Sequence, residues 1–311
     1  MLNIQSKNAP LSKVIIAFAI VYIVWGSTYF FVQVGLKDFP PFILGLFRFF
    51  TAGVLLMIWC FIKGYKLVDR HQMKTSFIVG NLLLFVGNGS IIWAEKTLPS
   101  SLVAVLVSAA PLWFVLFDKR NRASNFSDKY ILTGVFTGFA GVILLFGEKI
   151  FYNNFSSSEF IQIIALIVII AGNISWSVGA LYSKYNSVGN TSVGAAWQMI
   201  FAALTFFIVS CCTGEVFHFH PSQVHFRSSM AVIYLISLGS LAGYSAYIWL
   251  LQVRPATQVS TNAYVNPVVA VLLGIFWGGE TIDGLQILGL GIILLSVFII
   301  NIKKYRKKST I

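Results

Sequence analysis

The sequence predicts an all-α integral membrane protein in which ten transmembrane helices form two inverted five-helix repeats. Of its 311 residues, 57% are hydrophobic and only 10% are charged, whereas soluble proteins carry roughly 25% charged residues. The spacing of Trp93, Pro99 and Pro111 also recurs 156 positions later, from Trp249 to Pro267. Because a proline inside a helix costs about 3 kcal/mol or more, two prolines shared at one spacing indicate a duplicated unit.

The expected helices are separated by charge clusters, glycines and prolines. A bilayer core of about 30 Å needs roughly 20 apolar residues in each crossing helix. The ten expected spans are 14–34, 41–62, 75–94, 100–117, 130–147, 159–182, 192–213, 229–252, 256–278 and 284–302.

Basic residues are distributed unevenly among the expected loops. Of the 22 Lys and Arg residues, the exterior loops hold only Lys37, Lys96, Lys149 and Arg227, and Arg48 alone lies within a span. All the others fall on the side of the N-terminus, so the positive-inside rule predicts that both termini are cytoplasmic. The net charge of +12 is therefore mostly a topology signal with some affinity for anionic membrane lipids, and no nucleic acid is needed as a partner.

The ten helices are expected to form one membrane domain divided into repeats at residues 1–150 and 151–311. With five helices in each repeat, the second copy crosses the membrane in the opposite sense. Trp25 then aligns with Trp176, and Arg48 aligns with Gln198. Inverted repeats with Pro-interrupted helices at matching positions are typical of secondary transporters, whose solute site lies where the halves meet.

Several motifs occur in order along both halves. They are WGSTYF from Trp25, LFRFFTAG around Arg48, GNG at Gly87–Gly89, YVNPVVAVLLG from Tyr264, and GGE ending at Glu280. On these motifs the chain resembles the drug/metabolite transporter superfamily, and within it the EamA-type permeases of bacteria. The resemblance implies a permease of the bacterial inner membrane that exports small metabolites by alternating access.

The repeats differ at one of these motifs. Glu280 follows Pro267 by 13 residues, whereas the matching position after Pro111 is Ser124. Glu280 is therefore not expected to be half of a symmetric gate.

Arg48 is the strongest candidate for a substrate-binding residue. A charge at the bilayer centre costs about 2.5 kcal/mol on insertion scales, so Arg48 needs a partner or an aqueous cavity. Its guanidinium could bind an anionic group of the solute or form a movable gate pair. Alternatively, it could clamp a helix-end carbonyl or Glu95 as a structural element.

Other polar and aromatic residues also lie within the expected spans. Trp25 and Tyr264 lie near the middle of the membrane, where their rings could accept flat, apolar or cationic solutes. Buried amides must face the bundle or a water-filled path, either as solute contacts or as bonds between helices. These amides are Asn88, Asn173, Gln198, Asn262 and Asn266. The expected lining of the solute cavity is Arg48, Trp25, Asn88, Tyr264 and Asn266.

Two acidic residues and two prolines are candidates for coupling and movement. Glu95 and Glu280 lie near exterior helix ends, where they could carry a coupling proton or remain solvated carboxylates. Pro111 and Pro267 are possible hinges, since proline leaves a backbone carbonyl without its N–H partner.

The sequence also limits the kind of reaction that we expect. It contains no nucleotide-binding loop, so transport is expected to follow a gradient, with protons as a possible coupling ion. It has no Asp or His within a span and no HExxH or GxSxG motif, so we expect no enzyme and no cofactor. The exterior histidines His218, His220 and His225 lack a nearby carboxylate or cysteine at metal-site spacing, so no metal is expected. A channel-like facilitator is the alternative function.

Overall fold

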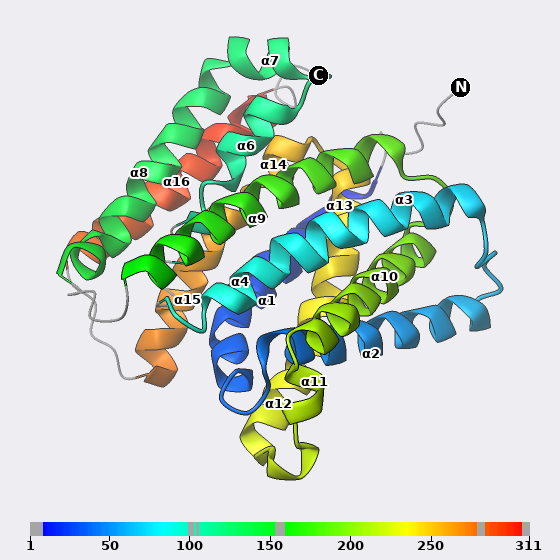
Figure 1. Ribbon diagram of the computed structural model, residues 1–311. Helices are drawn as coiled ribbons and strands as arrows, with labels where there is room; N and C mark the ends of the chain where they lie inside the picture. The colour runs from blue at the N-terminus through cyan, green and yellow to red at the C-terminus, as the bar shows by residue number, and fades with distance from the viewer. Residues whose placement is uncertain (1–8, 99–102, 104–105, 153–158, 279–283, 307–311) are drawn as a thin grey trace.

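The computed structural model describes residues 9–98, 103, 106–152, 159–278 and 284–306. Every element of regular structure in this part of the chain is a helix (Figure 1). The all-α fold predicted from the sequence is therefore confirmed.

The first half of the chain combines long helices with shorter helical segments. Its third helix is continuous but changes from α to π geometry and back in the order α3, η1, α4. The elements are α1 (Leu11–Gly35), α2 (Pro41–Ile62), α3 (Arg70–Gly80), η1 (Asn81–Asn88), α4 (Gly89–Ala94), α6 (Ala110–Phe117), α7 (Arg122–Ser127) and α8 (Lys129–Tyr152).

The long helices of the second half follow a similar order, with additional short segments between them. A π segment again interrupts its third long helix. The elements are α9 (Glu159–Asn186), α10 (Thr191–Cys212), α11 (Glu215–His218), η2 (Pro221–Gln223), α12 (Phe226–Tyr234), η3 (Leu235–Tyr244), α13 (Ser245–Val253), α14 (Ala256–Val259), α15 (Asn262–Gly278) and α16 (Gly284–Arg306).

Six helices in the described part of the chain are long and apolar enough to cross a membrane. These are α1, α2, the continuous helix Arg70–Ala94, the part Ile163–Asn186 of α9, α10, and the continuous helix Phe226–Val253. Their outer surfaces carry large apolar side chains, such as Phe61 and Ile62 of α2, which are 71% and 73% exposed. Such surfaces suit contact with lipid. The total of ten spans remains a prediction.

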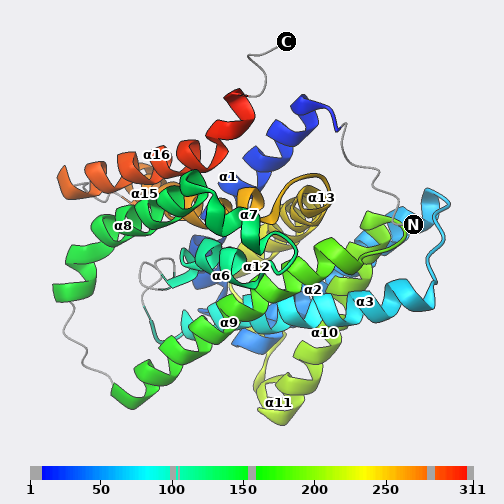
Figure 2. The same ribbon diagram turned by 90° about the horizontal axis from the view of Figure 1, so that it is seen from above.

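Helix pairs that are far apart in sequence pack closely. A Cβ at Gly45 of α2 would touch Phe206 of α10, and one at Gly53 would touch Ile200. As the residue number rises along α2 it falls along α10, so the two helices are antiparallel. Figures 1 and 2 show α2, α3 and α10 on one side of the bundle and α8 and α16 on the other.

Candidate functional site

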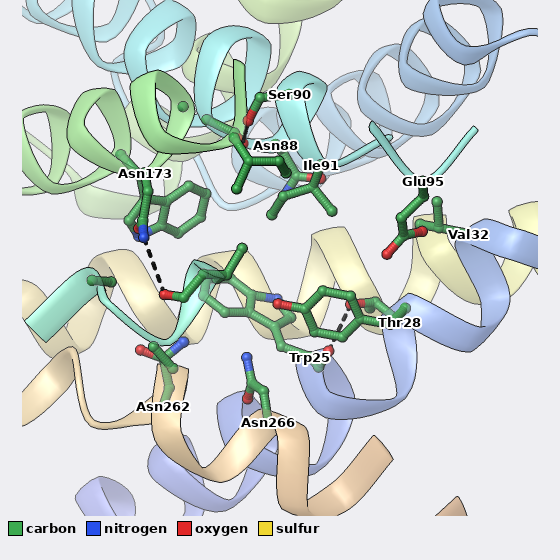
Figure 3. A pocket seen from close by; sticks show the side chains of 18 of the residues that line it. Trp25, Thr28, Val32, Asn88, Ser90, Ile91, Glu95, Asn173, Asn262 and Asn266 are labelled. Carbon is green, nitrogen blue, oxygen red and sulfur yellow. Dashed lines mark hydrogen bonds between the residues drawn. The ribbon is translucent and has the colours of Figure 1, made fainter. Parts of the chain in front are cut away.

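A cavity lies between helices of the two halves of the chain. Its empty volume is about 740 Å³, including open solvent. It is lined by Trp25, Thr28, Tyr29, Val32, Arg48, Gly87, Asn88, Ser90, Ile91, Glu95, Val107, Ala110, Phe114, Ile169, Gly172, Asn173, Trp176, Asn262, Ala263 and Asn266. Figure 3 shows Asn88, Asn173 and Glu95 facing Asn262, Asn266 and Trp25 across this space.

Arg48 lies on α2 with only 3% of its surface exposed. Its Nε donates a hydrogen bond to Ser240 Oγ at 2.9 Å, and its Nη1 donates one to Asn88 Oδ1 at 3.2 Å. The guanidinium carbon also lies 4.9 Å from the centre of the Phe49 ring. All of these partners are neutral, so they orient the guanidinium without cancelling its charge.

Glu95 directly follows α4, at one end of the cavity (Figure 3). Its side chain is buried, and neither Oε1 nor Oε2 has a hydrogen-bond partner among the residues that the structure describes. The interpretation of Arg48 as a clamp on Glu95 therefore has no hydrogen bond to support it. A buried polar group without a partner is costly, so this carboxyl group is suited to bind a proton or a donor group of a solute.

The amides in the cavity differ in how far they are engaged by the protein. Asn173 Nδ2 donates to the carbonyls of Leu106 and Val107 at 2.8 and 3.3 Å, so it joins α9 to the first half as well as lining the cavity. Asn266 Oδ1 is buried and has no hydrogen-bond partner in the ranges of the chain that the structure describes. This oxygen is therefore available to a solute.

Two tryptophans form an aromatic wall of the cavity. The rings of Trp25 and Trp176 meet edge to face with centroids 5.4 Å apart. Trp25 Nε1 donates to the carbonyl of Gly239 at 3.0 Å, and Trp176 Nε1 donates to Tyr247 Oη at 2.9 Å. Because both N–H groups are used within the protein, the rings can offer a solute only their apolar surfaces.

The expected lining residues Arg48, Trp25, Asn88 and Asn266 lie together in the cavity, but Tyr264 does not. Tyr264 is fully buried, and its hydroxyl donates to the carbonyl of Val135 on α8 at 2.8 Å. The expectation for Tyr264 is corrected for a geometric reason. At 3.6 residues per turn, a residue two positions from both Asn262 and Asn266 points to the opposite side of α15.

The same periodicity would have identified Asn262, since it is four residues from Asn266 and shares its face of the helix. Sequence reasoning placed Asn173 and Asn262 among the mid-span amides but did not select them as lining residues. Ser90 and Thr28 were missed, because small hydroxyl side chains within a span give no distinct signal.

The two prolines occupy different positions in their helices. Pro267 lies inside α15, so it retains the position expected of a hinge. Pro111 lies in the first turn of α6, where proline replaces no interior hydrogen bond. It therefore marks the start of a helix and not a bend within one. Glu280 lies outside the described residues.

Similar proteins are membrane transporters. The profile of the EamA-like transporter family matches residues 12–147 and 163–302. The uncharacterized inner membrane transporter YedA of Escherichia coli K12 is 35% identical over 287 residues, which cover 92% of this chain and 89% of YedA. The uncharacterized transporter YoaV of Bacillus subtilis is 24% identical, covering 95% of this chain and 99% of YoaV.

A further relative and a solved structure extend this likeness. Protein PecM of Dickeya dadantii is 24% identical, covering 89% of each chain. One crystal structure superposes with a TM-score of 0.74 at 16% identity, covering 94% of this chain and 98% of the other, and this supports the fold. The buried polar cavity thus belongs to a membrane protein, and the chain is a member of the EamA-like transporter family.

Proposed function

We propose that this protein is a secondary transporter that carries a small metabolite out of the cell across the bacterial inner membrane by alternating access. In this proposal both chain termini are cytoplasmic. The cavity supports the proposal because α1, α2 and η1 of the first half face α9 and α15 of the second half across it. In transporters built from inverted repeats, solutes bind between the repeats near the middle of the membrane.

The observation that carries this proposal is the buried guanidinium of Arg48, which lines the cavity with neutral hydrogen-bond partners. A buried charge is stabilised by an opposite charge that also forms hydrogen bonds with it. A carboxylate of the solute would provide both. The aromatic wall formed by Trp25 and Trp176 would contact the apolar part of the same solute.

These two requirements define the proposed substrate class. An amino acid meets both, with a carboxylate for Arg48 and a side chain for the aromatic wall. Nucleobases and drug-like solutes meet the second requirement and, where they carry an acidic group, the first as well.

Glu95 is the proposed site of proton coupling. Its carboxyl group is buried and makes no hydrogen bond within the described part of the chain. Opening toward water would favour the charged form of the group, and closing would favour the neutral form. One proton could therefore be taken up and released in each transport cycle.

The test is uptake and efflux by purified protein in proteoliposomes, with an amino-acid and nucleobase panel and with or without an imposed pH gradient. Empty liposomes are the control. Solute movement that accelerates with the gradient supports the proposal. Movement that ignores the gradient would identify a channel-like facilitator, and no movement of any panel solute would contradict the proposal.

A further inference from the structure

Arg48 has a neutral counterpart in the second half of the chain. Arg48 is the eighth residue of α2, and Gln198 is the eighth residue of α10. Arg48 donates to Asn88, the last residue of η1, at 3.2 Å. In the same way Gln198 Oε1 accepts a hydrogen bond from the hydroxyl of Tyr244, the last residue of η3, at 2.7 Å. The two halves thus build the same polar contact from different residues.

The glycines next to these pairs correspond as well. A Cβ at Gly87 would lie 3.0 Å from the ring of Trp176, and a Cβ at Gly243 would lie 2.6 Å from Nε1 of Trp25. Each π segment therefore brings its backbone close to the tryptophan of the opposite half. The correspondence therefore includes these glycine–tryptophan contacts as well as the hydrogen bonds.

A second cavity adjoins Gln198. Its empty volume is about 360 Å³, including open solvent. Residues from α3, the α9–α10 connection, α10 and α13 line it, and none of them carries a charge. Polar side chains of the lining include Gln72, Ser76, Asn190, Gln198 and Gln252.

The second cavity and Arg48 lie toward opposite sides of the membrane. Arg48 lies in the N-terminal half of α2, and the second cavity lies beside the N-terminal half of α10. Because α2 and α10 are antiparallel, these N-terminal halves lie toward opposite sides. With the termini inside, the second cavity is on the cytoplasmic side, and it is called the cytoplasmic cavity below.

We propose that the cytoplasmic cavity is a second solute site, which binds uncharged hydrogen-bonding groups, such as amides and hydroxyls, of the transported solute. This inference rests on the proposed function, because the solute is the one that also binds near Arg48. It assigns the solute a first contact on the cytoplasmic side that does not require an acidic group.

The contacts of the cavity residues explain this choice of ligand. Gln72 Nε2 donates to the carbonyl of Asn190 at 2.7 Å, and Ser76 Oγ donates to the carbonyl of Gly194 at 3.2 Å. Gln198 is 2% exposed, and its Nε2 makes no hydrogen bond to any residue that the structure describes. This amide therefore remains as a donor for a neutral acceptor group, and none of the described lining residues is a cation that would select an anion.

Thiol labelling can test whether the cavity is reached from the cytoplasm. The background is a variant in which Cys60, Cys211 and Cys212 are replaced. In it, Ser76→Cys places a near-isosteric reporter in the cytoplasmic cavity. Thr28→Cys places a matched reporter in the first cavity, which is the cavity lined by Arg48. Leu204→Cys, on an outward-facing part of α10 that is 47% exposed, is the control. A charged, membrane-impermeant thiol reagent is applied to right-side-out and inside-out vesicles.

We expect Ser76→Cys to react only from the cytoplasmic face, Thr28→Cys to react from the external face, and Leu204→Cys to react from neither. The same amino-acid and nucleobase panel is then added as a competitor. By mass action, a solute at about ten times its dissociation constant should slow the labelling of Ser76→Cys about ten-fold.

A second variant separates solute binding from access. Gln198→Leu combined with Tyr244→Phe removes both partners of one hydrogen bond, which leaves no buried group unpaired. This change should abolish protection of Ser76→Cys while leaving protection of Thr28→Cys intact. Failure of Ser76→Cys to react from the cytoplasm, or labelling that no panel solute slows, would overturn the second site.

The second solute site could be wrong while the proposed function is right. Transport of the same panel by the cysteine-free protein distinguishes these two outcomes. If the protein transports a solute that does not protect Ser76→Cys, only the second site is wrong. If it transports no solute and no solute protects Thr28→Cys, the proposed function is wrong. The labelling of Ser76→Cys still decides the second site in that case.

Discussion

At the scale of single residues, the buried guanidinium of Arg48 is the group most directly tied to solute recognition. Replacing it by alanine removes the charge and the hydrogen bonds to Ser240 and Asn88. A hydrogen bond to a charged group contributes roughly 1.5–3 kcal/mol, so Arg48→Ala should weaken binding of an anionic solute by at least about ten-fold. Proteoliposome uptake at several solute concentrations measures this loss.

Ser240→Ala is the matched control for Arg48→Ala, because it removes one orienting contact and keeps the charge. We expect it to retain most of the uptake. An Arg48→Ala protein that is inserted, folded and fully active would show that the guanidinium does not bind the solute.

Glu95 gives a second prediction at this scale. Glu95→Gln keeps the size of the side chain and removes its ability to carry a proton. Transport should then no longer respond to a pH gradient, while Glu95→Asp should retain the response. Because an amide avoids the cost of a buried unpaired charge, the midpoint of thermal unfolding should stay equal or rise. Gradient-driven uptake by Glu95→Gln that matched the unmodified protein would exclude Glu95 as the proton carrier.

The candidate site could be predicted from the sequence where chemistry alone is informative. Arg48, Glu95 and the mid-span amides were identifiable because charges and amides are costly in an apolar span. The direction in which a side chain points depends on the phase of its helix. Tyr264 was selected for its depth, although its position two residues from Asn262 and Asn266 turns it toward α8.

At the scale of elements, the π segments η1 and η3 shape the site, and the sequence did not predict them. Each lies inside a long helix, and each ends at a residue that bonds to the eighth residue of a neighbouring helix. A π turn differs from an α turn by a small change in hydrogen bonding, which apolar periodicity cannot resolve. The positions of the helices were therefore easier to predict than their internal geometry.

Asp38 joins two elements on the proposed exterior side, the α1–α2 connection and the start of α12. Its carboxylate accepts a hydrogen bond from the backbone N–H of His225 at 2.9 Å. The nearby hydroxyl of Ser228 and then the hydrogen bonds from His225 hold the pKa of the Asp38 carboxyl at about 2, below its ordinary value of 3.8. The ionised Asp38 carboxylate therefore stabilises the folded protein fully at pH values above 3.8. This stabilisation is lost as the pH falls from 3.8 toward about 2 and the carboxylate binds a proton.

Asp38→Asn should accordingly lower the midpoint of thermal unfolding at pH 7. The difference in this midpoint between Asp38→Asn and the unmodified protein should shrink as the pH falls from 3.8 toward about 2. Thermal unfolding in detergent at a series of pH values measures both effects. A difference that stays constant down to pH values near 2 would contradict the assigned role of the carboxylate.

At the scale of the whole molecule, the duplicated architecture and the distribution of charge were the strongest sequence signals. Composition and the repeated Trp and Pro spacing predicted a helical membrane protein, and the fold and the family match agree with this. The sequence could not show how the helices enclose a cavity, because that depends on contacts such as Gly45 against Phe206 and Gly53 against Ile200.

The orientation in the membrane can be tested with reporter fusions. A green fluorescent protein at the C-terminus should fluoresce, since both termini are expected inside the cell. Alkaline phosphatase should be active when fused in the connection 36–40 and inactive when fused in the connection 63–69. The reverse pattern would invert the proposed topology and exchange the sides of the two cavities.

Alternating access also requires that the contacts closing one side can break. On the proposed cytoplasmic side, the buried Asp118 accepts a hydrogen bond from the hydroxyl of Tyr185 at 2.6 Å. Asn121 Nδ2 donates to Asp118 Oδ2 at 3.1 Å and to the Tyr185 hydroxyl at 2.8 Å. This network joins the segment after α6 to the end of α9, and therefore the first half of the chain to the second.

Tyr185→Phe removes the hydroxyl but keeps the ring, whose centre lies 4.4 Å from the guanidinium carbon of Arg120. Since a hydrogen bond to a charged group contributes roughly 1.5–3 kcal/mol, the population open to the cytoplasm should rise about ten-fold. Ser76→Cys should then be labelled faster from the cytoplasmic face, and Thr28→Cys more slowly from outside. Tyr182→Phe on the same helix is the matched control, because no hydrogen bond of its hydroxyl occurs in the described part of the chain. Equal labelling rates in Tyr185→Phe and Tyr182→Phe would show that the network stabilises the fold without closing the transport path.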